Sequence, residues 1–364
     1  MKKTIFYNKH KNLDAKLVDF AGWEMPINYP AGIIKESGFV RDSCGMFDVS
    51  HMGRVEVIGK NATKFIDKLL PVDVNAINVS AAKYTLLINE NKEILDDLII
   101  YKISEEKYLL VINASNTDED LIWINKVKED VNIINITDKT GMLAIQGPEA
   151  LEKINLLSND AIADLGRYKY KEIKIQGMNI FVARTGYTGE DGVEIIFNNN
   201  DAEKIWELLS EKNVHPCGLG ARDLLRVEAG LHLYGHEIDK KSNPIDIGLG
   251  RVLESKSPFY INHEYITGID IKSGTETLIG LIIKDRGIAR EGNEIYINNK
   301  IIGRVTSGTH SPRIKSAIAI GKIDKNFNNI KNTVKIKVRD KFLEAEITKL
   351  PFYRRRKKWA FLIT

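Results

Sequence analysis

The chain has 364 residues, of which 43% are hydrophobic and 28% are charged. This composition is typical of a folded globular protein with about two or three domains. Lysine plus arginine number 53 against 49 for aspartate plus glutamate, and the resulting net charge of +4 is too small to favour a nucleic-acid partner. The two cysteines, Cys44 and Cys217, are too far apart in the sequence for a CxxC site or a disulfide framework, so we expect a cytoplasmic protein.

The N-terminus and the apolar runs argue against a membrane role. Residues Met1–Lys11 carry charges throughout and contain no apolar core of the kind found in a secretory signal. The longest apolar runs, such as Tyr108–Ile112, are far shorter than the roughly 20 residues of a spanning helix. We therefore expect buried strands and no membrane partner.

The first two-thirds of the chain mix strand and helix patterns. Strands are predicted over Gly53–Ile58, Tyr84–Asn89, Asp97–Ile103, Lys107–Asn113, Asn179–Arg184 and Val193–Phe197. Helices are predicted over Asn61–Leu70, from Ser115 or Thr117 to about Asp130, and over Pro148–Leu157, Asp201–Asn213 and Ala221–Ala229.

The last part of the chain contains only strand patterns. Six short strands are predicted over Leu278–Ile283, Glu294–Ile297, Lys300–Thr306, Ala317–Ile323, Thr333–Arg339 and Phe342–Lys349. Short strands separated by glycine and asparagine turns predict a small barrel or sandwich. We place the boundary near residues 268–277, which divides the chain into domains of residues 1–268 and 276–364.

Two carboxylates, Asp96 and Asp97, open the apolar strand that continues to Tyr101. Because side chains alternate between the two faces of a strand, Asp97, Ile99 and Tyr101 share one face. If this face coincides with that of Tyr84, Asp97 lies at the mouth of an apolar pocket, where a carboxylate can bind or accept a proton from a substrate nitrogen. The alternative is a carboxylate that merely ends the hairpin or caps nearby N–H groups.

Two further segments place polar groups where packing does not require them. The glycine-rich loop Arg184–Glu194 joins two strands, and loops of this kind bring polar groups close to a ligand. The glycines of Pro216–Gly220 precede a short helix that carries Arg222 near its start. Glu194 and Arg222 together offer an acceptor and a donor fork for the amide edge of a flat heterocycle. The alternatives are a solvated acidic turn and a surface arginine paired with Asp223 or Glu228.

Several common catalytic motifs are missing. The sequence has no P-loop motif, and its Gly-x-Gly segments lack the third glycine of a dinucleotide-binding fingerprint. His232 and His236 have the spacing of zinc ligands on a helix, but Gly235 weakens the helix and no glutamate follows His232. The neighbouring side chains of Ser50 and His51 diverge, which disfavours a nucleophile–base pair. We expect no metal site.

Seven segments resemble, in the same order, the landmarks of the aminomethyltransferase family of the glycine cleavage system, the T proteins. They are Phe20–Pro26, Gly45–Gly53, Asp96–Leu98, Ile145–Pro148, Arg184–Glu190, Gly218–Asp223 and Ser307–Pro312. The resemblance covers almost the whole chain. It implies an α+β fold with three lobes: two interleaved α+β lobes and a C-terminal β-barrel-like lobe around a central funnel.

The resemblance also implies an activity. A member of this family transfers the one-carbon unit of the aminomethyl group carried by the lipoyl arm of the H protein to tetrahydrofolate. The products are 5,10-methylenetetrahydrofolate, ammonia and the dihydrolipoyl H protein. Rival readings are a folate-dependent demethylase, a non-enzymatic folate-binding iron–sulfur maturation protein and a domain of an amine-oxidising flavoprotein. The maturation protein's Lys-Gly-Cys-Tyr segment is replaced here by Arg184–Tyr187, and no added dinucleotide-binding region supports the flavoprotein.

Carried over residue by residue, the resemblance assigns the carboxylate beside the reactive folate nitrogens to Asp97. It implies that Glu194 and Arg222 hold the pterin edge. The folate pocket is implied to be lined by Met52, Tyr84, Ile99, Tyr101, Asn113, Tyr168 and Tyr187. The chain departs from the family at the hairpin turn Glu90–Ile94, where relatives usually have Gly-Gly. The cationic run Arg354–Lys358 is expected to meet the folate tail or an acidic carrier, or to be a solvated tail.

Overall fold

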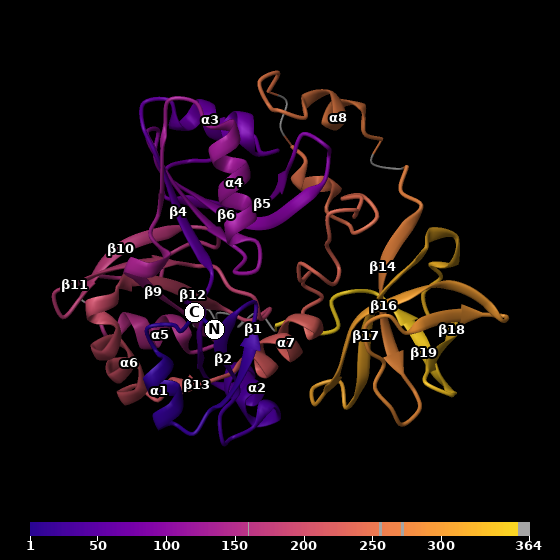
Figure 1. Ribbon diagram of the computed structural model, residues 1–364. Coiled ribbons are helices and arrows are strands. Elements are labelled where there is room, and N and C mark those ends of the chain that lie inside the picture. The colour runs from indigo at the N-terminus through magenta and orange to yellow at the C-terminus, as the bar shows by residue number, and fades with distance from the viewer. Residues whose placement is uncertain (159, 255–256, 271–272, 356–364) are drawn as a thin grey trace, which may run out of the picture.

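The computed structural model describes residues 1–158, 160–254, 257–270 and 273–355. Two sheets with their helices form the larger part of the molecule, and a barrel of strands lies to one side of it (Figure 1). The predicted mixture of helix and strand followed by an all-strand C-terminal part is confirmed. The division into domains of residues 1–268 and 276–364 stays a prediction.

The first sheet has five strands and carries the Asp96–Asp97 pair. Its strand order is β5-β6-β7-β4-β8. The strands are β4 (Gly53–Ile58), β5 (Ala81–Ile88), β6 (Ile94–Ser104), β7 (Lys107–Ile112) and β8 (Asn132–Asn135). Helices α3 (Ala62–Leu69) and α4 (Thr117–Val127) pack against it, and their apolar faces share one core cluster with the strands. The asparagine-rich turn after β5 keeps the hairpin closed, because the Asn89 side chain accepts bonds from the backbone N–H groups of Asn91 and Glu93.

The second sheet has six strands and carries Glu194. Its strand order is β10-β11-β12-β9-β3-β13. The strands are β3 (Gly45–Asp48), β9 (Thr140–Gln146), β10 (Tyr170–Ile175), β11 (Met178–Ala183), β12 (Gly192–Asn198) and β13 (His215–Pro216). Helices α1 (Tyr7–Asn12), α5 (Ala150–Asn155) and α6 (Ala202–Glu211) lie beside it (Figure 1).

The two sheets are interleaved along the chain. Strand β3 belongs to the six-stranded sheet, and the next strands β4 to β8 belong to the five-stranded sheet. Strand β9 then belongs to the six-stranded sheet again. A third apolar cluster, which includes Phe47, Val49, Tyr101 and Met142, contains residues of both sheets. This shared core packs the two interleaved sheets against each other.

The remaining elements of the larger part surround the region between the sheets and the barrel. Strands β1 (Lys16–Phe20) and β2 (Trp23–Asn28) form a hairpin, and α2 (Ile33–Asp42) follows it. Helix α7 (Leu219–Glu228) lies between the six-stranded sheet and the barrel (Figure 1), with α8 (His263–Gly268) in the connecting segment. The β1–β2 hairpin was not among the predicted elements.

The C-terminal part is a closed barrel in the order β14-β17-β16-β15-β18-β19, which decides between the barrel and the sandwich. The strands are β14 (Glu276–Ile283), β15 (Glu294–Ile297), β16 (Lys300–Ser311), β17 (Ser316–Asp324), β18 (Thr333–Val338) and β19 (Lys341–Thr348). Alternation of buried and exposed residues along β18 places Val334 and Ile336 inside the barrel. Closure pairs every strand edge and leaves none open.

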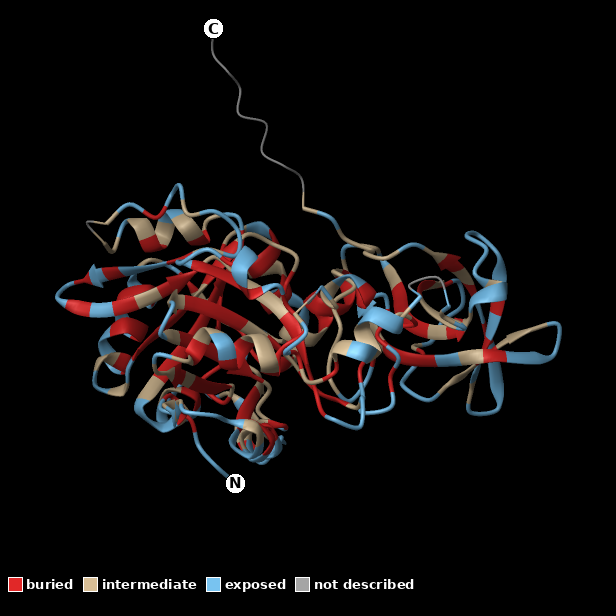
Figure 2. Ribbon diagram, turned by 90° about the horizontal axis from the view of Figure 1, so that it is seen from above, coloured by how far each residue is buried: buried red, intermediate tan, exposed pale blue. Residues whose placement is uncertain are grey.

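Burial follows the strands in both parts of the molecule, while the peripheral turns are exposed (Figure 2). Among the described residues, no helix combines the length and apolar character needed to cross a membrane.

Candidate functional site

A large cavity of 1240 Å³ lies where the two sheets, helix α7 and the barrel meet. Strand β6 supplies Asp97 and Ile99 to its wall, β12 supplies Glu194, and α7 supplies Arg222 and Arg226. The barrel contributes residues 306–309, and the β1–β2 hairpin contributes residues 18–21 and 27. The cavity exceeds the roughly 300–1,000 Å³ common for small-ligand sites, so it has room for one ligand and the end of a second.

Every predicted site residue except Tyr101 lines this cavity. The lining includes Met52, Tyr84, Asp97, Ile99, Asn113, Tyr168, Tyr187, Glu194 and Arg222. These residues come from segments that are distant in sequence, and tertiary folding brings them together around one space.

Tyr101 lies behind the wall instead of in it. Its side chain is buried, and its ring contacts Tyr170 and Phe181 with centroid distances of 6.1 and 5.2 Å. Its hydroxyl lies 3.3 Å from the Thr185 hydroxyl, which donates a 2.5 Å hydrogen bond to the Glu194 carboxylate. Tyr101 therefore supports Glu194 through Thr185 and does not touch the cavity itself.

Asp97 points into the cavity because of the pleat of β6. Leu86 and Tyr84 of β5 pair with Asp97 and Ile99, so they share a face as the period of two predicts. A bulge at Leu95 interrupts the ladder just before Asp96, and bulges of this kind aim nearby side chains. The altered turn leaves the alternation from Asp97 onward undisturbed.

The Asp97 carboxylate accepts two hydrogen bonds from neutral groups. The Tyr84 hydroxyl donates to Oδ2 at 2.9 Å, and the Asn113 side-chain amide donates to Oδ1 at 2.9 Å. Burial is the largest cause and the nearby charge of Asp96 the second, and together they raise the pKa of Asp97 to about 7. A carboxyl group with such a pKa exchanges a proton near neutral pH, which suits acid–base chemistry on a nitrogen.

Arg222 lies across the cavity on α7. Its guanidinium carbon sits 4.7 Å from the centre of the Tyr187 ring, and its Nη1 is buried without a hydrogen-bond partner among the described residues. Burial lowers the pKa of Arg222, while the charge of Glu194 raises it. A guanidinium with a buried and unused donor is ready to bind a carbonyl or carboxylate group of a ligand.

The loop that carries Tyr187 is tied to the six-stranded sheet by Gln146. The Gln146 amide nitrogen donates to the carbonyl oxygens of Thr185 and Val193 at 3.1 and 3.3 Å, and its oxygen accepts from Thr188 at 2.8 Å. Gly186 passes so close to this side chain that a Cβ there would lie 2.1 Å from the Gln146 oxygen. The glycine is therefore needed for close approach.

His51 is a wall residue that was not predicted. It lines the cavity, and its buried Nδ1 has no hydrogen-bond partner among the described residues. Burial lowers its pKa to about 4, so the imidazole is neutral at physiological pH. Its place within the Gly45–Gly53 landmark was the available signal. The adjacent Ser50 hydroxyl bonds the backbone of Met142 instead, consistent with side chains that diverge.

Arg226 is a second wall residue that was not predicted, and it lies about one turn along α7 from Arg222. It donates to Glu237 at 2.7 Å and to the Ser307 hydroxyl at 2.6 Å. The contact with Ser307 joins α7 to the barrel.

His232 and His236 both line the cavity but bind different groups. His232 Nε2 lies 2.7 Å from the Ile247 carbonyl oxygen, whereas His236 Nδ1 lies 3.2 Å from Glu291.

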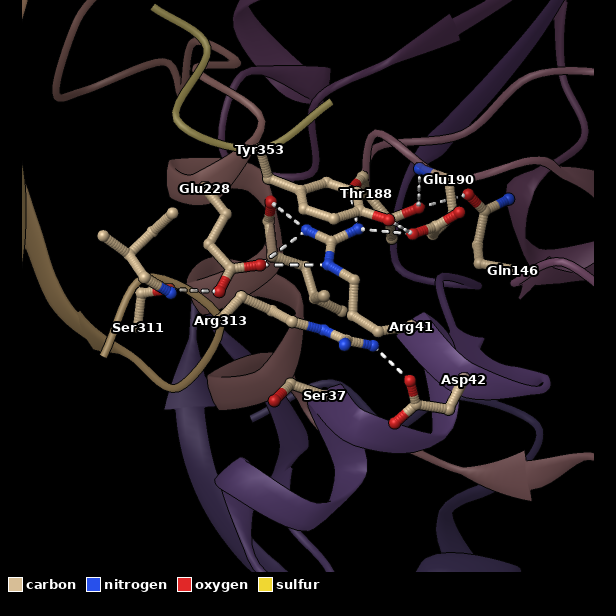
Figure 3. Close-up of polar contacts among 12 residues, drawn as sticks. Ser37, Arg41, Asp42, Gln146, Thr188, Glu190, Glu228, Ser311, Arg313 and Tyr353 are labelled. Carbon is tan, nitrogen blue, oxygen red and sulfur yellow. Dashed lines mark hydrogen bonds and ion pairs between the residues drawn. The ribbon is translucent and has the colours of Figure 1, made fainter. Parts of the chain in front are cut away.

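A polar cluster behind the cavity fastens the barrel and the chain's C-terminal segment to the wall (Figure 3). Arg41 of α2 lies at its centre, donates to Glu228 of α7 and to the Thr188 carbonyl oxygen at 2.7 Å each, and lies under the Tyr353 ring. The Ser311 hydroxyl donates to the other oxygen of Glu228 at 2.6 Å. The cluster connects the helix that carries Arg222 with the loop that carries Tyr187.

The C-terminal cationic run is described only at its start. Arg355 forms a 2.7 Å ion pair with Asp191, which also binds Arg184. The rest of the run, residues 356–358, lies outside the described residues, so its expected role stays a prediction.

The comparisons with known proteins cover nearly the whole chain. Residues 6–257 match the family described as the GCVT N-terminal domain, and residues 277–354 match the glycine cleavage T-protein C-terminal barrel domain. Two relatives named aminomethyltransferase, from Alkaliphilus oremlandii and Thermosipho melanesiensis, are 39% and 43% identical to this chain. These matches cover 98% and 97% of this chain and 99% and 98% of the relatives.

A solved structure also resembles this chain over nearly its whole length. The crystal structure of glycine cleavage system aminomethyltransferase T from Bartonella henselae matches with a TM-score of 0.91 and 32% identity, over 98% of this chain and 99% of that one. Sequence and fold thus agree with the resemblance stated from the landmark segments. The chain belongs to the glycine cleavage T-protein family, the aminomethyltransferases.

Proposed function

We propose that this protein transfers the one-carbon unit of an aminomethyl group from the lipoyl arm of an H protein to tetrahydrofolate. The products are 5,10-methylenetetrahydrofolate, ammonia and the dihydrolipoyl carrier. One observation carries the proposal: Asp97, Glu194 and Arg222 come from three different elements and line the same cavity.

The arrangement of Glu194 and Arg222 suits the edge of a pterin. A pterin offers N–H donors beside a carbonyl acceptor, so it needs a carboxylate and a donor fork side by side. Thr185 holds the Glu194 carboxylate at 2.5 Å, and Tyr187 stacks against the guanidinium of Arg222. Both groups are oriented before a ligand binds, which lowers the entropic cost of recognition.

The chemistry depends mainly on positioning. Folate N5 is a nucleophile and the aminomethyl carbon is an electrophile, so holding them at attack distance contributes several kcal/mol, of the order known for oriented reactants. The two protons lost from folate N5 and N10 as the ring closes end on the departing ammonia and on the lipoyl thiol. We assign to Asp97 the binding of positive charge on nitrogen and the movement of a proton during these steps.

The size of the cavity agrees with a second substrate. Apolar side chains of the β1–β2 hairpin and α2, namely Val18, Phe20, Ile27 and Ile33, line one part of the wall. We assign this part to the arm that delivers the aminomethyl group. We further propose a cytoplasmic location, which the two buried free thiols of Cys44 and Cys217 support because reduced thiols persist there.

The direct test mixes the protein with tetrahydrofolate and an aminomethyl-loaded lipoyl carrier protein, and measures released ammonia and methylenetetrahydrofolate. Equal amounts of both products are expected. An N-methylated amine in place of the loaded carrier provides the control for a demethylase. Turnover of the methylamine without turnover of the carrier would overturn the proposal, as would failure of calorimetry to detect tetrahydrofolate binding.

A further inference from the structure

Two buried carboxyl groups lie behind Asp97, on the side of β6 that faces away from the cavity. Asp96 belongs to the same strand, and Asp120 belongs to the first turn of α4. Both residues are 0% exposed, and neither lines the cavity. Burying charge in such a place is costly unless it is compensated, so the arrangement requires an explanation.

The hydrogen bonds distinguish the two carboxyl groups. Asp96 accepts from the Asn113 backbone N–H at 2.8 Å, from the Asn113 amide at 2.7 Å and from the Asn116 amide at 2.7 Å. The side chain of Asp120 lies close enough to Asp96 for the two carboxyl groups to interact, yet neither Asp120 oxygen accepts a hydrogen bond from a donor group among the described residues. Three donors stabilise a negative charge on Asp96, whereas Asp120 has none.

Two carboxyl groups can hydrogen-bond to each other only when one of them holds a proton. The donors fix the charge on Asp96 and therefore leave the proton on Asp120. The Asn113 amide, which donates to both Asp96 and Asp97, joins this pair to the cavity wall without offering a path for a proton. The influence of the pair on Asp97 must act through space.

We propose that Asp96 and Asp120 form a pair with one proton and one negative charge, and that this charge behind Asp97 makes its carboxyl group bind a proton more tightly. The pair acts on the protonation of Asp97 through its charge and does not touch substrate. The inference rests on the proposed function for the role of Asp97, but the protonation of Asp120 does not depend on it.

The pKa directions of Asp120 and Asp97 agree with this geometry, whereas for Asp96 burial raises the pKa and the hydrogen bonds from Asn113 and Asn116 lower it. Burial raises the pKa of Asp120 to about 10, and the charge of Asp96 is the next cause. For Asp97, with a pKa of about 7, burial is likewise the largest cause and the charge of Asp96 the second. The pair thus has a stable proton at pH values where Asp97 titrates.

Other ionisable groups face the pair, Asp97 or the phenols beside them from each neighbouring element. They are Tyr84 of β5, Glu119 of α4, Tyr187 of the glycine-rich loop, Tyr234 after α7 and Asp239 beyond it. The three phenols have raised pKa values and are neutral in the relevant range. Glu119 is ion-paired with Lys240 at 2.5 Å on the surface, so solvent and this partner screen its charge.

Infrared spectroscopy of the ligand-free protein tests the protonation directly. At about pH 8.5, well above the pKa of Asp97 and below that of Asp120, the wild type should show the C=O stretching band of a protonated carboxyl group. The band should be absent in Asp120→Asn and retained in Asp97→Asn. A wild type without this band, or an Asp120→Asn variant that keeps it, would overturn the pair.

The pH dependence of kcat/KM tests the effect on Asp97. The double variant Asp96→Asn/Asp120→Asn has no charge behind Asp97. The acidic limb of its profile of kcat/KM against pH should therefore move to lower pH by about one unit, the order expected for neighbouring charges in a protein. Glu119→Gln, which changes an exposed charge on the same helix, should not move the limb. A double variant with lower kcat and an unmoved limb would assign the pair a merely structural role and overturn the proposal.

The two measurements separate the possible failures. If the wild type transfers no aminomethyl group, or if Asp97→Asn is fully active, the proposed function of Asp97 fails while the infrared band still stands. If aminomethyl transfer is normal but the infrared band of the protonated carboxyl group is absent, the proposed protonation of Asp120 is wrong and the proposed function stands.

Discussion

Arg41 and Glu228 lie 187 residues apart in the sequence and form a buried ion pair, in which Nε and Nη2 both donate to Oε2 at 3.0 and 2.7 Å. Each side chain is 1% exposed. The pair connects α2 with the end of α7, and through Ser311 it also connects the barrel (Figure 3). The site is therefore held by contacts between parts of the chain that sequence separates widely.

Changing Arg41 to alanine should lower the free energy of unfolding by about 3–5 kcal/mol, because it leaves the Glu228 charge buried without its partner. Urea denaturation measures this effect. Arg313→Ala provides the matched control, since Arg313 pairs with Asp42 nearby but both side chains are substantially exposed. The control should change stability by about 1 kcal/mol or less. Equal effects of the two substitutions would contradict the importance assigned to burial.

Changing Asp97 to asparagine should reduce the rate of aminomethyl transfer by about 10²–10⁴-fold, the range typical for loss of an acid–base group. The dissociation constant for tetrahydrofolate should change much less, because Glu194 and Arg222 retain their positions. Single-turnover kinetics and calorimetry measure the two quantities separately. A fully active Asp97→Asn protein together with an inactive Asp96→Asn protein would reverse the assignment of the two strand faces.

Changing Arg222 to methionine should separate binding from stability. Loss of its hydrogen bonds to ligand should weaken tetrahydrofolate binding by about 10–100-fold, as expected for bonds worth about 1.5–3 kcal/mol. The folded protein should become no less stable, because Nη1 is buried without a partner and its removal relieves a desolvation cost. Thermal unfolding of the ligand-free protein measures the second effect, and a large drop in Tm would contradict it.

Gly186→Ala should displace the loop that carries Tyr187. The new Cβ would lie 2.1 Å from the Gln146 side chain, which binds the loop backbone on both sides. We expect weaker tetrahydrofolate binding and a loss of stability of about 1–3 kcal/mol from overpacking. Gly268→Ala is the control, because a Cβ there meets nothing within 4 Å. Unchanged binding in Gly186→Ala would show that the loop tolerates the displacement.

The raised pKa values of Asp97 and Asp120 predict how stability depends on pH. Each group has a higher pKa in the folded protein than its usual value of about 3.9, so the folded state binds more protons. Stability is therefore greatest below about pH 4 for these groups, and it falls as pH rises to about 7 for Asp97 and about 10 for Asp120.

The slope from each group is at most about 1.4 kcal/mol per pH unit. Urea denaturation at several pH values, compared between the wild type and Asp120→Asn, isolates the contribution of Asp120. The variant should lose the part of the slope above pH 7. Parallel curves for the two proteins would show that Asp120 does not keep its proton on folding.

The element patterns were predictable because they depend on local periodicity. The alternation of Thr333–Val338 identifies β18, and the apolar spacing of residues 202–211 identifies α6. Strand ends were less well predicted: β16 continues to Ser311, beyond the predicted Thr306, because β17 pairs with its extension. The β1–β2 hairpin was not predicted because β1 is largely exposed and lacks a regular apolar pattern.

The candidate site was likewise predictable only in part. The period of two predicted that Asp97 and Ile99 share a face of β6, and the pairing of Leu86 with Asp97 and of Tyr84 with Ile99 shows that this face coincides with that of Tyr84. Tyr101 shares that face and was therefore expected in the cavity, but Phe181 and Tyr170 of the second sheet cover it. The side chains of a strand face that remain exposed are those against which no other segment packs. The spacing of residues in the sequence does not specify this packing.

The sequence by itself determined the family, the change from mixed helix and strand to an all-strand C-terminal part, and the residue types that face each way along β6, because these follow from ordered motifs and backbone geometry. Only the tertiary structure decided that Asp97, Glu194 and Arg222 share one cavity, that His51 belongs to its wall, and that Asp96 and Asp120 lie together behind it. These relationships join groups from different elements, and their charges, exposure and proton affinities are set by packing between segments that are distant in the chain.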